Sequence, residues 1–209
     1  MNLYLVPNDP ERTTLVSANG VAQYQVTTTK ARTFRSPAVL RITRSAESEG
    51  DSIVAEVEWR KWSAHPVVRS NVFDGAVQEL EVREFLYKLG RFTSSTRYFL
   101  GNDDEEYRWK LVKGVGFVLT NTLTSEEVAR FTQDAVSEGF FRGEKKWMLQ
   151  VQPSSLDIDM IVLTFIIMEK RRRDRVAEHM KVANQDEDPL EGGGDEAGGM
   201  GASMIGMEV

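Results

Sequence analysis

The stretch "SLDIDMIVLTFIIMEKRRRDR", residues 155–175, joins an uninterrupted apolar run to a basic cluster. Such a segment lies across a bilayer, on its surface, or in the core of the protein itself. As a helix with a rise of roughly 1.5 Å per residue, the apolar run over residues 156–168 extends about 20 Å. The hydrocarbon core of a bilayer is about 30 Å thick. The run is therefore too short to span a membrane.

Charged residues at both ends of this run are arranged as in a helix of a water-soluble protein. Asp157 and Asp159 occupy the expected first turn, directly after Ser154 and Ser155, either of which is a suitable N-cap. Basic residues follow the run. Acids at the start and bases at the end both interact favourably with the helix dipole. We therefore expect a helix over about residues 155–181.

The apolar side chains of the run cover every side of this helix. A helix that is apolar all round must be enclosed by lipid or by protein, and its length excludes lipid. A helix that lies on a membrane surface needs a strongly polar face, which this run lacks. We therefore expect a hydrophobic helix buried inside the protein.

The chain before Pro153 consists of short β-rich segments separated by Gly, Asn and Asp turns. In "EYRWKLV", for example, Tyr107, Trp109 and Leu111 alternate with basic residues, as in a strand with one buried face. About eleven such segments predict an antiparallel meander closed into a barrel or a sandwich. One short helix is expected at "VREFLYKLG", with Gly90 as its C-cap.

One-sided strands need a body to pack on, and an all-round apolar helix needs an enclosure. We therefore expect a mainly β (α+β) fold, an antiparallel β-barrel of about eleven to twelve strands that encloses the hydrophobic C-terminal helix.

The formal charge of −6 is concentrated at the C-terminal end. Residues 184–209 contain seven acids and neither Lys nor Arg, which leaves 26 basic and 25 acidic residues in residues 1–183. The segment is also rich in glycine, so it buries too little apolar surface to offset the entropy of ordering. We expect one domain over residues 1–183 and a disordered acidic Gly-rich tail over residues 184–209.

The chain has no cysteine, which excludes disulfides, thiolate nucleophiles and zinc–thiolate sites. Its first residues lack the basic and apolar regions of a signal peptide, and Pro7 interrupts them. We expect a cytoplasmic or nuclear protein that is not secreted.

No motif for catalysis or for a cofactor is evident in the sequence. His65 and His179 lack metal-ligand spacing. The acidic stretch "GNDDEE", residues 101–106, is either a calcium site or a hairpin turn, and its turn-forming residues favour the turn.

The basic cluster is the sharpest candidate for a functional site. Its members are Lys170, Arg171, Arg172, Arg173 and Arg175. Near an anionic membrane such cations contribute about 1 kcal/mol each, and the alternatives are a protein partner or a solvated helix end that complements the dipole. Nucleic acid fits poorly, because residues 1–183 are nearly neutral and Trp59, Trp62, Trp109 and Trp147 occupy expected inward strand positions.

Three stretches carry a resemblance to a known family: "AEVEWRKWSAHPVV", "VREFLYKLGRFTSSTRYFLGNDDEEYRWKL" and "SSLDIDMIVLTFIIMEKRRRDR". They resemble an uncharacterised fungal family, a domain of unknown function, that is similar to the tubby C-terminal-like superfamily of tubby, LURP-one-related and scramblase proteins. The resemblance implies a β-barrel around a hydrophobic C-terminal helix. Tubby proteins bind phosphoinositide headgroups through basic residues, so the resemblance also implies membrane recognition, at the level of the fold.

These observations favour a non-enzymatic binding or scaffold module that recognises anionic phospholipid headgroups at a membrane surface. The alternative is an enzyme that uses a polar pocket on the barrel. A deep pocket with converging Asp, Glu or His side chains would favour the enzyme.

Overall fold

The computed structural model describes residues 1–29, 36–45, 53–60, 65–73, 78–90 and 95–185. The chain divides into two units, Met1–Arg172 and Arg173–Val209. Helix α2 (Ile158–Gln185) contributes residues to both units. All the strands of the described residues lie in the first unit.

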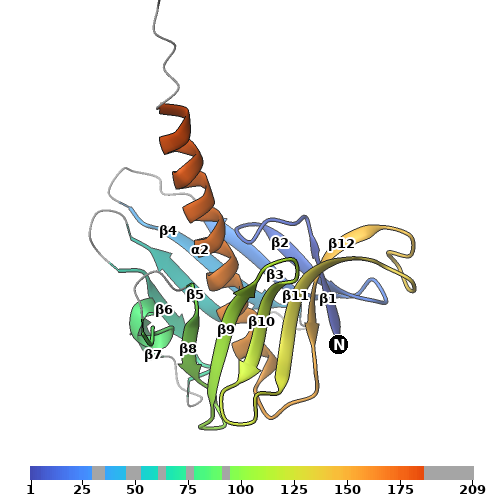
Figure 1. Cartoon of the computed structure of the whole chain (residues 1–209), viewed down its shortest axis with the longest axis horizontal. Coiled ribbons are helices and arrows are strands. Elements are labelled where there is room, and N and C mark those ends of the chain that lie inside the picture. The colour runs from blue at the N-terminus through green and yellow to red at the C-terminus, as the bar shows by residue number, and fades with distance from the viewer. Residues whose placement is uncertain (30–35, 46–52, 61–64, 74–77, 91–94, 186–209) are drawn as a thin grey trace, which may run out of the picture. The chain divides into compact units, whose positions relative to one another are not determined.

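Twelve antiparallel strands form one sheet in the described part of the chain (Figure 1). They are β1 (Asn2–Val6), β2 (Thr13–Ser17), β3 (Ala22–Thr29), β4 (Ala38–Arg44), β5 (Ile53–Trp59), β6 (Val67–Ser70), β7 (Gln78–Glu81), β8 (Arg97–Leu100), β9 (Glu106–Val112), β10 (Gly116–Asn121), β11 (Glu127–Ala135) and β12 (Lys145–Val151). A short helix, α1 (Val82–Phe85), follows β7.

The sheet consists of two meanders, which are joined where the first strand pairs with the last strand. Strands β1 to β7 follow one another in space, as do β8 to β12, and β1 pairs with β12 in the middle. At this junction Leu3 lies opposite Leu149, and both side chains are fully buried. The alternation of apolar and polar residues thus has the predicted result, because one face of each meander is turned towards the core.

The predicted closed barrel is wrong, because the sheet has two edges, β7 and β8. After Glu81 the chain turns into α1, so β7 does not continue beside β8. One isolated bridge joins this region to β8: Tyr87 and Tyr98 exchange two backbone hydrogen bonds of 3.0 and 2.9 Å. We call the region between β7 and β8 the seam.

The same region contains two further differences from the sequence prediction. Strand β7, "QELE", was not anticipated, since it lacks apolar alternation. Helix α1 ends at Phe85, well before Gly90, because Tyr87 is drawn into the bridge with β8. As a result Leu89, which lies within the stretch predicted to be helical, is half exposed.

Helix α2 is buried as predicted: every residue from 159 to 170 is shielded from solvent. It begins at Ile158 and is capped by Asp157, whose Oδ1 accepts a hydrogen bond of 2.9 Å from the Asp159 N–H. The predicted caps, Ser154 and Ser155, are therefore incorrect. The Ser155 hydroxyl instead donates to the carboxylate of Asp103.

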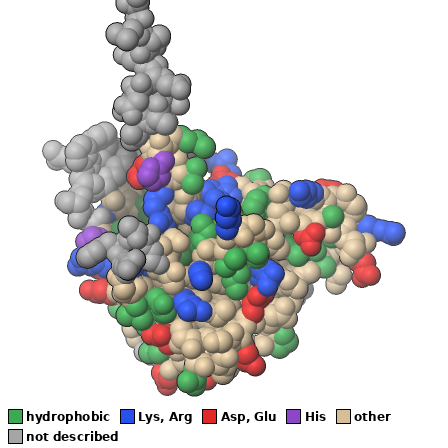
Figure 2. All heavy atoms as spheres, in the orientation of Figure 1, with side chains coloured by type: hydrophobic (Ala, Val, Ile, Leu, Met, Phe, Trp, Pro, Cys, Tyr) green, Lys and Arg blue, Asp and Glu red, His purple; other side chains and the backbone are tan. Residues whose placement is uncertain are grey.

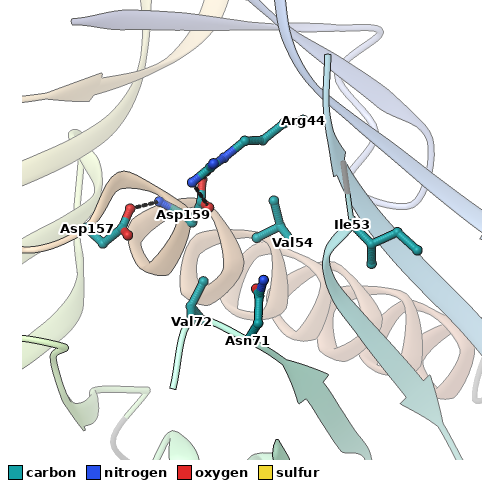
Figure 3. Close-up of a pocket in the computed structure, with 7 residues that line it drawn as sticks. All are labelled: Arg44, Ile53, Val54, Asn71, Val72, Asp157 and Asp159. Carbon is teal, nitrogen blue, oxygen red and sulfur yellow. Dashed lines mark hydrogen bonds and ion pairs between the residues drawn. The ribbon is translucent and has the colours of Figure 1, made fainter. Parts of the chain in front are cut away.

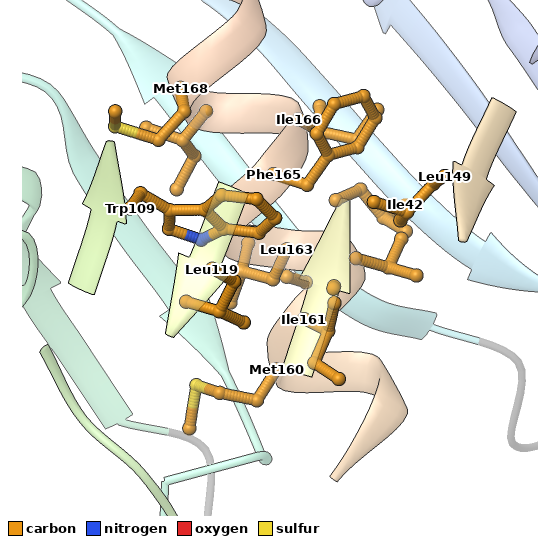
Figure 4. Close-up of a cluster of buried hydrophobic side chains, with 14 of the residues drawn as sticks. Ile42, Trp109, Leu119, Leu149, Met160, Ile161, Leu163, Phe165, Ile166 and Met168 are labelled. Atoms are coloured by element: carbon orange, nitrogen blue, oxygen red, sulfur yellow. The ribbon is translucent and has the colours of Figure 1, made fainter. Parts of the chain in front are cut away.

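The core is formed by the inner face of the sheet and the first half of α2 (Figure 4). Phe165 packs against Phe131 and Trp109, with ring centroids 4.6 and 6.2 Å away. Burial of one such large apolar side chain contributes about 1.5–3 kcal/mol. Because α2 is contacted from both meanders, the helix is the common element of the core.

In the second unit, the described residues are the last turns of α2. Their side chains from residue 174 to 181 are exposed, including the apolar residues Val176 and Met180. Most of the predicted tail, residues 186–209, lies outside the described residues. Among the helices that the structure describes, none is long and apolar enough to cross a membrane.

Candidate functional site

Two members of the predicted basic cluster form ion pairs in the first unit. Lys170 Nζ lies 2.6 Å from Glu11 Oε1 and 4.9 Å from the ring centroid of Trp59, and only 8% of Lys170 is exposed. Arg172 donates two hydrogen bonds of 2.7 Å to Glu169, a carboxylate that is fully buried. This hydrogen bonding raises the pKa of Arg172.

The structure thus gives Lys170 and Arg172 roles in packing. An unpaired carboxylate at the buried position of Glu169 would cost several kcal/mol of folding free energy. Arg172, one turn further along α2, stabilises this negative charge by pairing with it. Arg171 is half-buried, and Arg173 and Arg175 belong to the second unit. All three also have interaction partners.

A polar pocket of about 140 Å³ lies beside the first turn of α2 (Figure 3). It is lined by Arg44, Ile53, Val54, Asn71, Val72, Asp157 and Asp159. Two acidic side chains and a cation converge here, as the enzyme alternative requires.

Asp159 in this pocket is fully engaged in hydrogen bonds. It is 4% exposed, accepts a bond of 2.7 Å from the Tyr24 hydroxyl and one of 3.0 Å from Arg44 Nε, and its second oxygen pairs with Arg44 Nη2. Burial and the bond to Asp159 raise the pKa of Tyr24 far above its usual value. The Tyr24–Asp159–Arg44 cluster fixes the start of α2 to β3 and β4.

The acidic stretch 101–106 forms the turn between β8 and β9, as the turn prediction has it. Asp103 accepts hydrogen bonds from the Tyr107 and Ser155 hydroxyls, at 2.7 and 2.5 Å. Burial alone would raise the pKa of Asp103, but these bonds outweigh it and lower the pKa. Across the described residues, no group of three or more His, Asp or Glu side chains is placed to hold a metal ion.

The remaining candidates from the sequence are separate in space. Arg83 Nη1 donates a hydrogen bond of 2.8 Å to His65 Nε2, and His179 is exposed on the second unit. Trp109 is fully buried, and Trp59 and Trp147 pack against the core, as expected. Trp62 lies outside the described residues.

A shallow hollow of about 470 Å³, here called the hairpin hollow, lies at the turn between β9 and β10. Of its lining residues, Lys113 alone is charged. The others are apolar or neutral: Leu111, Val112, Gly114, Val115, Gly116, Thr132, Gln133 and Trp147. Leu111 is 42% exposed. A cation beside an exposed leucine and partly buried apolar side chains, with no acid in the lining, suits an anionic amphiphile.

A third pocket, of about 280 Å³, lies at the seam and is here called the seam pocket. Its lining is mainly apolar and its charged members are both acidic. It consists of Val72, Phe73, Gln78, Leu80, Glu84, Phe85, Tyr87, Leu100, Gly101, Asn102, Asp104 and Met160. The charged side chains that line the hairpin hollow and the seam pocket are therefore of opposite sign.

Neither pocket was anticipated from the sequence. The signal for the hairpin hollow is present in "WKLVKGV", where two lysines alternate with apolar residues at a Gly turn. The seam pocket has no local signal, since its residues come from β7, α1, the turn after β8 and α2.

One protein family matches nearly the whole of the sheet and the buried part of α2. A family model described as a family of unknown function (DUF6593) matches residues 8–174. The chain belongs to this family. The DUF6593 match covers every strand from β2 to β12 and the buried half of α2, so the family corresponds to the helix-filled sheet. No curated protein and no solved structure is significantly similar to the chain.

The DUF6593 match confirms one part of the predicted resemblance, namely a domain of unknown function. It provides no link to the tubby-like superfamily or to a fungal source.

Proposed function

We propose that this domain is a non-enzymatic binding module with a tubby-like fold that recognises anionic phospholipid headgroups at a membrane surface. The observation that carries the proposal is the hairpin hollow, which combines the cation Lys113 with the exposed side chain of Leu111 and contains no acid. Peripheral membrane binding needs both components, apolar contact and attraction to anionic lipid.

Cations on the neighbouring sheet surface support the proposal. Arg108 and Lys110 project from the outer face of β9, and neither forms an ion pair within the described residues. Figure 2 shows Lys and Arg side chains on the face over β9, β10 and β11, with hydrophobic side chains between them. In contrast, Arg130 on β11 is neutralised by Glu127, to which it donates bonds of 2.9 and 2.6 Å.

The basic cluster of α2 is a second part of the proposal. Lys170 and Arg172 pair with Glu11 and Glu169, and Arg171, Arg173 and Arg175 also have interaction partners, so the cluster is proposed to contribute through its positive charge at a membrane surface. Lys170 and Arg172 then act by holding the helix from which the others project.

Sedimentation of the full chain with phosphatidylcholine vesicles, with and without an added phosphoinositide, tests the proposal. We expect retention on the anionic vesicles at low salt and release at high salt, because salt screens exposed charges. Equal sedimentation with neutral and anionic vesicles would contradict it.

Variants separate the two cation groups. Since one cation near the surface contributes about 1 kcal/mol, Lys113→Ala should weaken binding about fivefold. Arg142→Ala removes the same charge from the exposed loop before β12 and is the matched control, with no expected loss. The triple change of Arg171, Arg173 and Arg175 to Ala reports on the basic cluster independently.

A further inference from the structure

The seam pocket has the composition of a site for a ligand that is both apolar and cationic. Phe73, Leu80, Phe85 and Met160 provide apolar walls, and the Phe73 and Phe85 rings pack edge to face with centroids 4.8 Å apart. Glu84 and Asp104 are exposed and bring two negative charges to the rim, while no Lys or Arg lines the pocket. Its volume accommodates one or two side chains.

Charge excludes the chain's own tail as the occupant. Residues 184–209 hold seven acids and no Lys or Arg, so they would be repelled by Glu84 and Asp104. An anionic headgroup is disfavoured for the same reason. The occupant must carry positive charge close to an apolar group.

The backbone around the pocket is suited to an extended chain. Tyr98 exchanges both of its hydrogen bonds with Tyr87 across the seam. In antiparallel strands the bonding direction alternates, so Leu100, two residues further along β8, also directs its N–H and C=O into the seam. Leu100 lines the pocket and is 55% exposed.

The opposite edge has the same property. The Val82 N–H donates to Pro66 O at 2.8 Å. Because bonding alternates along a strand, the backbone N–H and C=O groups of the even-numbered residues at the end of β7 point towards β6. The N–H and C=O of Glu79 therefore point away from β6 and towards the seam. A sheet edge of this kind accepts an added strand, with neighbouring pockets reading alternate side chains.

We propose that the seam pocket binds an extended segment of a partner protein in which an apolar residue stands next to Lys or Arg. The apolar side chain enters between Phe73, Leu80 and Met160. The cation pairs with Glu84 or Asp104, and the peptide backbone bonds to the edge at Leu100 or Glu79. This site is separate from the hairpin hollow, and its ligand has the opposite charge.

The probe is a blocked Lys-Leu-Lys-Leu-Lys peptide, titrated into the isotope-labelled full chain and followed by NMR. We expect saturable shifts of the Leu100 and Glu79 amides and of the Met160 methyl group. The same peptide with Glu in place of Lys should give none. If the Lys peptide leaves these resonances unchanged up to millimolar concentration, or if the Glu peptide binds equally well, the proposal is overturned.

Charge variants test the rim. Glu84→Gln together with Asp104→Asn should weaken the Lys peptide about tenfold, since exposed ion pairs contribute up to about 1 kcal/mol each. Asn tolerates the left-handed backbone of Asp104, whose φ is 61°. The matched control, Asp134→Asn with Glu138→Gln, removes two exposed charges from β11 and the loop after it. Equal weakening by both pairs overturns the proposal, because the attraction would then be unspecific.

A third variant tests the position without altering the acids. Leu100→Lys puts a cation at the exposed mouth and should abolish peptide binding while the melting temperature stays unchanged. Undiminished binding to this variant would place the peptide elsewhere and overturn the proposal. Hexylammonium, which has an apolar chain and a cation but no peptide backbone, tests whether backbone hydrogen bonds contribute to binding. If it binds as tightly as the peptide, the site binds small cations and the peptide proposal is wrong.

Discussion

The indole Nε1 of Trp109 donates a hydrogen bond of 2.9 Å to Thr164 Oγ1 in the interior of α2, where neither residue is exposed to solvent. The Thr164 hydroxyl in turn donates to Met160 O at 2.8 Å. Strand β9 is thus joined to the helix by a polar contact inside an apolar core.

The substitution Thr164→Val tests this contact. It keeps the shape of the side chain but leaves the buried indole N–H without a partner, so the free energy of unfolding should fall by about 1–3 kcal/mol. Urea denaturation followed by tryptophan fluorescence measures the change. In a Trp109→Phe background the same substitution should cost less, and an equal cost in both backgrounds would show that the bond is unimportant.

The position of α2 in the core is tested by Phe165→Asp. This change places an unpaired charge between Phe131 and Trp109, at a cost of several kcal/mol, and should abolish most of the stability. Val176→Asp is the control on the same helix, since Val176 is 42% exposed and its change should be nearly neutral. Similar thermal denaturation curves for the two variants would contradict the buried position of Phe165.

The Tyr24–Asp159 bond predicts a loss of stability in alkali. The pKa of Tyr24 is raised in the folded state, whereas an unfolded tyrosine loses its proton near pH 10, at about its ordinary pKa. The contribution of Tyr24 is therefore complete below about pH 10 and is lost as the pH rises further. Tyr87 and Tyr107, with pKa values raised to about 12, act in the same direction.

Urea denaturation over a pH series measures this effect. Above pH 10 the slope of the unfolding free energy against pH should be less steep in Tyr24→Phe, by up to about 1.4 kcal/mol per pH unit. Identical slopes in the variant and the parent chain would show that the Tyr24 hydroxyl is not protected by folding.

The composition of the C-terminal end predicts that it contributes little to stability. Deletion of residues 184–209 should leave the melting temperature nearly unchanged, because a Gly-rich acidic segment makes few contacts. Differential scanning calorimetry of both chains is the measurement. A drop of several degrees would show that the tail packs on the domain.

The sequence predicted those parts of the fold that depend on local patterns. The all-round apolar run identified a buried helix. Short β-rich segments between turn residues, several of them alternating as Tyr107 and Trp109 do, identified eleven of the strands. Strand β7 was not predicted, because "QELE" has no such pattern and forms a strand only through its pairing with β6. The open seam also escaped, since closure depends on how edges distant in sequence meet.

The candidate site was less predictable for the same reason. Whether a cation is available depends on partners far away in the chain, and Lys170 is used by Glu11 and Trp59. A run of basic residues contains no information about these contacts. The two pockets likewise form from elements that only the fold brings together.

The central claim is that the sheet folds around α2, so that both proposed binding surfaces depend on the helix. Thermal and urea denaturation of residues 1–155 alone, with near-ultraviolet circular dichroism and sedimentation, tests it most directly. We predict an aggregating or unfolded chain without a cooperative transition, because the inner faces of both meanders lose the body that they pack on. A soluble monomer with a cooperative transition would contradict the claim and would make α2 an appendage of a sheet that folds by itself.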